Sequence, residues 1–400
     1  MQTTTTVPGT ATVGVLRESA PGERRVALTP DGVGRLIALG YAVCVQSGAG
    51  EGAWFDDASY VSAGATIGDG DSVLSGSDIL LCVQPPDAAP QGSLLPDSTL
   101  IGLLHLRANP ALATSLADAK VTALSLDGLP RLLSSAQAMD VLSSQANAAG
   151  YKAALVAAEA FSGYFPMLMT AAGTMRPAKV LVLGAGVAGL QAIGTARRLG
   201  AVVTGYDVRD AARDEVLSTG ASFLDLAAEG GPVSAGGDGG YARELTDDER
   251  AAQQAAMSKA IASFDIVITT AQVPGRRPPV LVRADAVAAL APGSVVVDLA
   301  AGAEGGNVEG VVADSTTVTD NGVTLIGAGN LPSSMSRAAS SAYSRNISAL
   351  LAHLTTDGAL TLDTADEITA GLLITRDGEI VHPAVRAAVP VRAAASEGAR

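Results

Sequence analysis

Short runs rich in valine, isoleucine and leucine alternate with alanine-rich stretches of helical periodicity along nearly the whole chain. This alternation is typical of parallel β-sheets whose strands are joined by covering helices, so it predicts an α/β fold with two doubly wound parallel sheets. The expected strands of the first sheet are residues 13–16, 41–46, 78–84, 100–104 and 121–126, and those of the second are residues 179–184, 201–207, 222–226, 265–270, 294–300 and 323–327.

Two long helical stretches suggest how the domains are divided. Ser143 to Ser162 separates the two groups of strands and is the expected connector. Ser336 to Leu354 follows the last strand, and its apolar face is expected to pack back on the first group. The predicted first domain is therefore discontinuous, residues 1–145 and 334–400, and residues 146–333 form the second, with long helices between them.

Composition and charge exclude several classes of protein. With 48% hydrophobic and 16% charged residues the chain is globular, and its net charge of −14 repels nucleic acid and anionic membrane surfaces. No apolar run approaches the roughly 18 residues that span a bilayer, and the N-terminus lacks the features of a secretory signal. We therefore predict a cytoplasmic protein with no direct membrane insertion. Cys44 and Cys82 lie in strand-like runs and are interpreted as buried thiols, so no metal site is expected.

The strongest chemical motif lies between Val180 and Arg209. An apolar strand leads into G-x-G-x-x-G at the start of a helix, and a second strand ends at an aspartate. The glycines allow a tight turn, close approach of the backbone to a pyrophosphate and close packing of helix on strand, and the helix N-terminus offers free N–H groups. This context predicts a Rossmann-type dinucleotide site. Its expected residues are Gly184, Gly186, Val187, Ala188, Gly189, Asp207, Val208 and Arg209.

Asp207 bears on the choice of cofactor. Its carboxylate would accept hydrogen bonds from the adenosine ribose and repel a 2′-phosphate, which favours NAD(H) over NADP(H). Arg209 argues the other way, because an arginine there could pair with a phosphate. An arginine that is solvated or paired with Asp210 is the commoner arrangement, so we predict NAD(H).

Beyond this motif, the sequence resembles a known family. Val13 to Asp57, with ERRVALTP as its most recognisable part, resembles the opening of the family that alanine dehydrogenases share with the alpha subunits of NAD(P) transhydrogenases. Ser135 to Ala158, SAQAMDVLSSQANAAGYKAALVAA, is similar to the transhydrogenase loop that arranges arginine, glutamine and aspartate around a nicotinamide. The second similarity favours the transhydrogenase branch.

The resemblance implies a set of catalytic residues, namely Arg131, Gln137, Asp140, Ser143 and Tyr241. Side chains of these types suit the role, because a glutamine amide can both donate to and accept from a carboxamide, and an aspartate can hold an arginine. The first half of the loop departs from the family pattern by one extra residue between Arg131 and Gln137, and Ser135 stands where a second arginine is usual. Alternatively, Gln137 and Asp140 only cap the following helix.

Three further segments carry implied cofactor contacts. Residues 229–240, EGGPVSAGGDGG, contain six glycines. This composition is typical of a passive linker or a mobile flap. GGYAREL, which begins at Gly239, resembles the family's mobile loop and implies that Gly240 and Tyr241 close over the nucleotide. The segments at the ends of the next two strands resemble those that line the nucleotide crevice, which implies contacts from Ala271, Gln272 and Leu299.

Alanine dehydrogenase is the main alternative function. His105 and Arg25 stand where that enzyme has its histidine and arginine, but Gln84 replaces its lysine, and its catalytic aspartate has no clear counterpart. A nucleotide-sensing module without chemistry is a third possibility. A flavin site is disfavoured, because the second flavin-binding elements are missing.

The resemblance therefore implies the NAD(H)-binding subunit of a proton-translocating NAD(P) transhydrogenase. Such an enzyme transfers hydride directly between NADH and NADP⁺. The chain has no second dinucleotide fingerprint, so NADP(H) and the proton path would belong to separate NADP(H)-binding and membrane-spanning subunits. The resemblance also implies a homodimer attached peripherally to the inner face of the membrane. No nucleophile or general base is expected, because the cofactor carries the chemistry.

Overall fold

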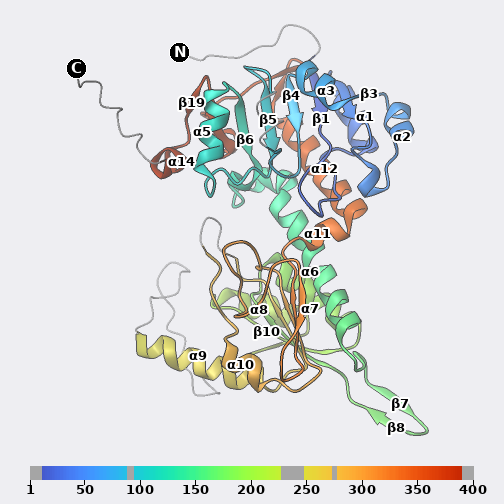
Figure 1. The fold of residues 1–400 in the computed structure, drawn as a ribbon, viewed down its shortest axis with the longest axis vertical. Helices are drawn as coiled ribbons and strands as arrows, with labels where there is room; N and C mark the ends of the chain where they lie inside the picture. The colour runs from blue at the N-terminus through green and yellow to red at the C-terminus, as the bar shows by residue number, and fades with distance from the viewer. Residues whose placement is uncertain (1–10, 88–93, 227–246, 273–276, 390–400) are drawn as a thin grey trace. The chain divides into compact units, whose positions relative to one another are not determined.

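The computed structural model describes residues 11–87, 94–226, 247–272 and 277–389 (Figure 1). The chain divides into two compact units. Unit 1 comprises Met1–Gln145 and Ser336–Arg400, and unit 2 comprises Ala146–Met335. Helix α6, Val141–Ala160, begins in unit 1 and continues into unit 2.

Unit 1 is built on one mixed sheet in the order β19-β18-β6-β5-β4-β1-β2-β3. The six strands from β6 to β3 are parallel, whereas β18 pairs antiparallel with both β6 and β19. The strands are β1 Thr12–Val15, β2 Ala42–Gln46, β3 Thr66–Gly68, β4 Ile79–Leu81, β5 Thr99–Gly102, β6 Thr122–Ser125, β18 Leu373–Arg376 and β19 Glu379–Ile380. The C-terminal segment thus supplies the antiparallel edge of this sheet.

Helices cover the sheet of unit 1 (Figure 1). They are α1 Pro30–Ala38, α2 Asp57–Ser62, α3 Gly70–Gly76, α5 Pro110–Asp118, α12 Ser336–Leu354, α13 Glu367–Leu372 and α14 Pro383–Ala388. Short 3-10 turns occur at η1 Glu51–Ala53, η2 Leu126–Gly128 and η3 Ser134–Met139, and β16 Thr355–Thr356 pairs with β17 Ala359–Leu360.

The buried face of α12 is rich in serine, and hydrogen bonds satisfy its polar groups. The backbone N–H groups of Val26 and Thr29 donate to the hydroxyls of Ser340 and Ser344 at 3.0 and 3.1 Å. Tyr343 is fully buried, and its hydroxyl donates to a backbone carbonyl at 2.9 Å. Buried polar groups cost free energy unless they are hydrogen-bonded, so these contacts let a serine-rich helix pack inside unit 1.

Unit 2 has a sheet in the order β11-β10-β9-β12-β13-β15-β14. All neighbours are parallel except the edge pair of β14 and β15. The strand order reverses beside β9, which is the point where open α/β sheets bind ligands. The strands are β9 Lys179–Leu183, β10 Val202–Tyr206, β11 Ser222–Phe223, β12 Ile266–Thr269, β13 Val295–Asp298, β14 Thr316–Val318 and β15 Thr324–Gly327.

The other elements in the described part of unit 2 are helices and a hairpin. The helices, besides α6, are α7 Val187–Arg198, α8 Ala211–Ser218, α9 Asp247–Ile261, α10 Ala284–Ala289 and α11 Leu331–Ser334. The hairpin consists of β7 Leu168–Thr170 and β8 Gly173–Met175.

The predicted α/β fold with two parallel-dominated sheets is confirmed, although the parallel strand β3 is not among the expected strands. Each sheet ends in antiparallel strands that the alternating pattern did not reveal, because β14, β18 and β19 are short and partly polar. Cys82 is buried as expected, but Cys44 is only half-buried, and both thiols are free.

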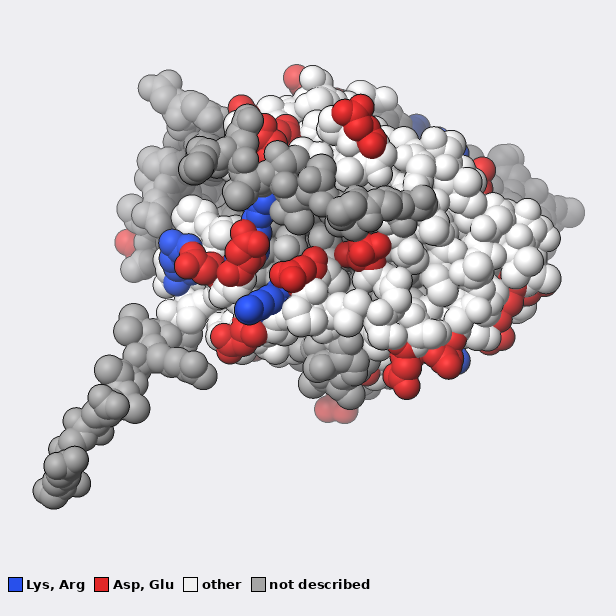
Figure 2. Space-filling view, turned by 90° about the horizontal axis from the view of Figure 1, so that it is seen from above, with Lys and Arg blue, Asp and Glu red and all other residues white. Residues whose placement is uncertain are grey.

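Within the described part of the chain, no helix combines the length and apolarity that a bilayer crossing needs. On the face drawn in Figure 2, acidic side chains outnumber basic ones, in keeping with the net charge.

Candidate dinucleotide site and nicotinamide loop

The glycine turn after β9 has the backbone geometry that its sequence predicts. Gly184 adopts a φ of +99°, a conformation that L side chains rarely adopt. A Cβ on Gly189 would collide with the carbonyl oxygen of Gly184, so only glycine lets α7 start this close to the strand. Gly186 precedes α7 with extended backbone, no side chain caps the helix, and the position of its missing Cβ is open space. The first turn of α7 can therefore present N–H groups to an anion.

Helix α6 fixes the start of α7 within unit 2. Gly150 has no room for a Cβ, because the carbonyl of Ala188 lies against it. Nearby, the side-chain amide of Asn147 donates to the Oε1 atom of Gln191 at 3.1 Å. These contacts hold α7 at the orientation that the glycine turn requires.

Asp207, directly after β10, already has protein partners. Its carboxylate accepts the N–H of Ala185 at 2.8 Å, and it pairs with the guanidinium Nε of Arg209 at 3.0 Å. Burial would raise the pKa of Asp207, but the hydrogen bonds from Arg209 and Ala185 outweigh burial and lower it. Arg209 is exposed, as the solvated alternative held, but the expected pairing with Asp210 is wrong, because its carboxylate partner is Asp207. Val208 is exposed beside the pair.

The residues expected at the ends of β12 and β13 lie together. The amide of Gln272 donates to the carbonyl of Leu299 at 3.0 Å. The backbone N–H of Ala271 donates to the side chain of Asn307 at 3.0 Å. The hydroxyl of Thr270 donates to the carbonyl of Gly184 at 3.0 Å, which ties this edge to the glycine turn.

Two residues that shape this edge were not predicted. Asn307 donates to the carbonyls of Ala271 and Pro279 at 2.9 and 2.8 Å, so it clamps the segment after β12. Asp298 is fully buried at the end of β13 and accepts from the hydroxyl of Thr269 at 2.9 Å. Burial raises the pKa of Asp298. No periodicity or motif marks an isolated Asn or Asp as such a clamp, so sequence reasoning missed both.

The proposed nicotinamide loop forms one polar cluster in unit 1. Arg131 donates through Nε to Asp140 at 2.9 Å and through Nη2 to the Ser143 hydroxyl at 2.7 Å. Asp140 also accepts the backbone N–H of Ser143 at 2.9 Å, which caps the start of α6. Burial opposes the hydrogen bonds from Ser143 and Arg131, but their sum lowers the pKa of Asp140, so it is ionised at neutral pH. The extra residue in the loop therefore does not separate Arg131 from Asp140.

Gln137 behaves differently from Asp140. It lies in η3 with an exposed side chain, and within the described residues that side chain has no hydrogen-bond partner. Asp140 thus does cap a helix, as the alternative interpretation held, whereas Gln137 does not. Its amide is left available to a ligand.

The positions expected of an alanine dehydrogenase site are differently engaged. Arg25 is 3% exposed and forms an ion pair with the fully buried carboxylate of Glu23. Its Nη1 atom also donates to the side chain of Gln145 at 2.9 Å. A guanidinium held in this way is not offered to a substrate carboxylate. His105 is exposed on backbone with a φ of +49°.

Glu18 carries a shifted pKa close to the Arg25 ion pair. Its carboxylate accepts the backbone N–H groups of Val83 at 2.6 Å and Gln84 at 3.0 Å. Burial raises the pKa of Glu18 from 4.5 to about 7, although these two N–H groups oppose the rise.

We expect Glu18→Gln to weaken the pH dependence of stability. Between pH 4.5 and about 7 the folded protein holds a proton on Glu18 that the unfolded chain releases. The wild-type free energy of unfolding therefore loses a contribution as the pH rises through this range. Urea unfolding at about pH 5 and about pH 8 measures the loss. Glu51→Gln, which removes an exposed carboxylate, is the control, and the same pH dependence in Glu18→Gln and wild type would contradict the assignment.

Tyr241 and the whole glycine-rich segment, residues 229–240 with Gly240, lie outside the described residues.

Comparison with known proteins identifies matches over both units. Residues 14–149 match the family model described as the N-terminal domain of alanine dehydrogenase/PNT, and residues 153–383 match the model of its C-terminal domain.

Individual relatives agree with these matches. A Rhodospirillum rubrum protein, named as the first part of the NAD(P) transhydrogenase subunit alpha, is 42% identical over 382 residues, which cover 93% of this chain and 98% of the relative. The alanine dehydrogenase of Mycobacterium tuberculosis is 33% identical over 302 residues, 74% of each chain. The structure of a transhydrogenase from Sinorhizobium meliloti aligns with a TM-score of 0.82 at 39% identity, covering 92% of this chain and 100% of that one. An L-alanine dehydrogenase structure aligns with a TM-score of 0.76 at 27% identity, covering 94% and 98%. Of these relatives, the transhydrogenases are the more similar.

Proposed function

We propose, since this chain belongs to the alanine dehydrogenase/PNT family, that it is the NAD(H)-binding subunit of a proton-translocating NAD(P) transhydrogenase. In this proposal hydride passes directly between NADH on this chain and NADP⁺ on a partner subunit. The similarity to proteins named as only the first portion of an alpha subunit supports the need for partners.

The residues present fit a dinucleotide. Gly186 leaves open space at the uncapped start of α7, where a pyrophosphate would meet the N–H groups of Val187, Ala188 and Gly189. The carboxylate of Asp207 would accept hydrogen bonds from the ribose hydroxyls while it also keeps its ion pair with Arg209. The backbone around Ala271, Gln272 and Leu299 would border the nicotinamide half, because it lies at the carboxyl ends of β12 and β13 beside the strand-order reversal.

One observation carries the transhydrogenase assignment: Arg131, Asp140 and Ser143 form a preorganised cluster and leave Gln137 unbonded within the described residues. A glutamine amide can donate to and accept from a carboxamide, and the ionised Asp140 keeps Arg131 in one orientation. We propose that Gln137 orients the nicotinamide and that the cluster positions the loop.

Bound NADH would supply the hydride, and this chain's residues would orient the nicotinamide ring and keep water from it. No general base is required of the protein. We propose that the NADP(H)-binding and membrane-spanning subunits are separate chains, that the protein acts as a homodimer, and that it attaches from the cytoplasm to the inner face of the membrane.

We predict that the protein does not oxidatively deaminate L-alanine. That reaction needs cations to hold the substrate carboxylate and a group to exchange its proton. Arg25 is committed to Glu23 and Gln145, and Gln84 stands where a lysine would be needed. Following the formation of NADH from NAD⁺ and alanine tests this prediction. Turnover of about 1 per second or faster would favour alanine dehydrogenase over transhydrogenase.

A further inference from the structure

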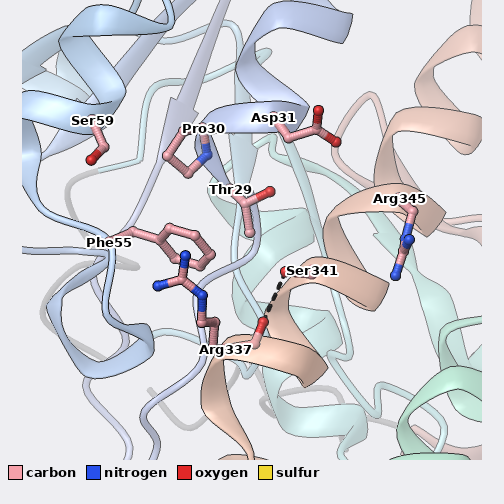
Figure 3. Close-up of a pocket in the computed structure, with 8 residues that line it drawn as sticks. All are labelled: Thr29, Pro30, Asp31, Phe55, Ser59, Arg337, Ser341 and Arg345. Atoms are coloured by element: carbon pink, nitrogen blue, oxygen red, sulfur yellow. Dashed lines mark hydrogen bonds between the residues drawn. The ribbon is translucent and has the colours of Figure 1, made fainter.

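Unit 1 contains a cavity of about 420 Å³ that has no part in the function proposed above (Figure 3). It lies between the start of α1, the segment that joins η1 to α2, and one face of α12. Cavities of about 300 to 1,000 Å³ are typical of small-molecule sites. The size is therefore sufficient for one small ligand.

Helix α12 lines the cavity with two arginines. Arg337, Ser341 and Arg345 follow one another at intervals of four residues, so they share one face of the helix. Both arginines are exposed. Among the residues that the structure describes, the guanidinium of Arg345 has no hydrogen-bond or ion-pair partner. Figure 3 shows both arginines extending from α12, with the guanidinium of Arg337 beside Phe55 and that of Arg345 at the other end of the labelled group.

Arg337 is held in position by neutral partners. Its Nη1 atom donates to the carbonyl of Trp54 at 3.0 Å, and its guanidinium lies 4.7 Å from the ring centroid of Phe55. Neither contact neutralises its positive charge. Arg337 is therefore a fixed cation with donors left over.

The other polar side chains that line the cavity already have hydrogen-bond partners within the protein. Asp31 alone among the lining residues is acidic, and its carboxylate already accepts from Arg35 at 2.8 Å. The lining hydroxyls donate elsewhere, Thr29 to Ser344, Ser59 to Asp56 and Ser341 to the carbonyl of Arg337. The donors that remain for a ligand are those of the two guanidinium groups.

We propose that this cavity binds a small phosphate ester. The phosphate would lie between Arg337 and Arg345, because planar guanidinium groups match the oxygens of a phosphate. The organic group would pack against the apolar surface of Phe55 and Pro30. The cavity shares no lining residue with the glycine turn or with the Arg131 cluster.

The chain carries its own reporter for this site. Trp54 is the single tryptophan of the sequence, is 70% exposed, and lines an adjoining hollow of about 440 Å³ with Phe55 and Arg337. We expect phenyl phosphate to change the tryptophan fluorescence saturably at constant ionic strength. Inorganic phosphate should bind at least about tenfold more weakly, since it buries no apolar surface. Absence of a saturable change would overturn the proposal.

Variants separate a specific site from a general salt effect. Arg345→Gln and Arg337→Gln should each weaken phenyl phosphate binding about tenfold or more, as expected for the loss of a charge-assisted hydrogen bond. Arg386→Gln, on α14 beside the β19 edge of the sheet, should bind like wild type. If all three variants bound phenyl phosphate with the same affinity, the proposal would be overturned. Among the described residues Arg345 makes no hydrogen bond or ion pair that the substitution would remove, so Arg345→Gln remains informative even if Arg337→Gln unfolds.

A third arm tests the ligand class. Benzoate presents the same ring with a carboxylate, and binding as tight as that of phenyl phosphate would overturn the phosphate assignment. NADH titration of Arg345→Gln should match wild type, which checks that the fold is intact. Because the fluorescence readout does not involve hydride transfer, a failure here is distinguishable from a failure of the proposed function.

Discussion

Gln137→Asn should slow hydride transfer about a hundredfold while leaving NADH affinity nearly unchanged. The substitution keeps the amide but withdraws it by about 1 Å, and a misplacement of that size can cost on the order of a hundredfold in rate. In the proposed site, affinity would depend mainly on the adenosine and pyrophosphate contacts at Asp207 and the glycine turn. The experiment pairs stopped-flow measurement of transfer with calorimetric titration of NADH.

Gln254→Asn is the matched control for this prediction. It makes the same chemical change on α9, where the Gln254 amide donates to the carbonyl of Leu281. It should transfer hydride at the wild-type rate. A wild-type rate in Gln137→Asn as well would mean that the exposed amide of Gln137 has no part in positioning the nicotinamide.

Asp207→Ala should weaken NADH binding about tenfold to a hundredfold and narrow the preference for NADH over NADPH. The carboxylate would hydrogen-bond the ribose hydroxyls, and bonds to a charged group contribute about 1.5 to 3 kcal/mol. Its removal also releases Arg209, which now pairs with it, to meet a 2′-phosphate. Titrating both nucleotides against both proteins measures the two effects.

Asp210→Ala serves as the control for Asp207→Ala. Asp210 lies three residues after Asp207 and is exposed, and its side chain makes no capping hydrogen bond to α8. Its loss should leave both affinities unchanged. Equal affinities of the wild-type protein for NADH and NADPH would contradict the assignment of NAD(H).

The sequence was most informative where the backbone itself imposes a residue type. The close approach of Gly189 to the Gly184 carbonyl and the positive φ of Gly184 tolerate only glycine, so the motif predicts the geometry. Buried parallel strands such as β9 and β13 likewise leave a long apolar run. The helix Ser336–Leu354 was predicted to its end residues, since its apolar positions recur at helical spacing.

Long-range side-chain contacts left no such trace. Asn307 clamps a segment more than thirty residues away, and Arg25 is sequestered by Gln145, a residue 120 positions along the chain. The partner of Arg209 was predicted wrongly for a different reason: Asp207 and Asp210 both lie within two residues of it, and the sequence does not show which carboxylate it meets. An edge strand such as β14 is also weakly encoded, because its three residues are all exposed and two of them are threonines, so it lacks the continuous apolar pattern of a central strand.

We propose above that this chain holds NADH for direct transfer to NADP⁺ on another subunit. The most direct measurement mixes the wild-type protein, loaded with NADH deuterated at the transferable position of the nicotinamide, with the NADP(H)-binding domain of its partner loaded with an NADP⁺ analogue. We expect rapid transfer, with the deuterium recovered in the reduced NADP analogue. Both nucleotides shown to be bound and no transfer, or a reduced product without the label, would contradict it.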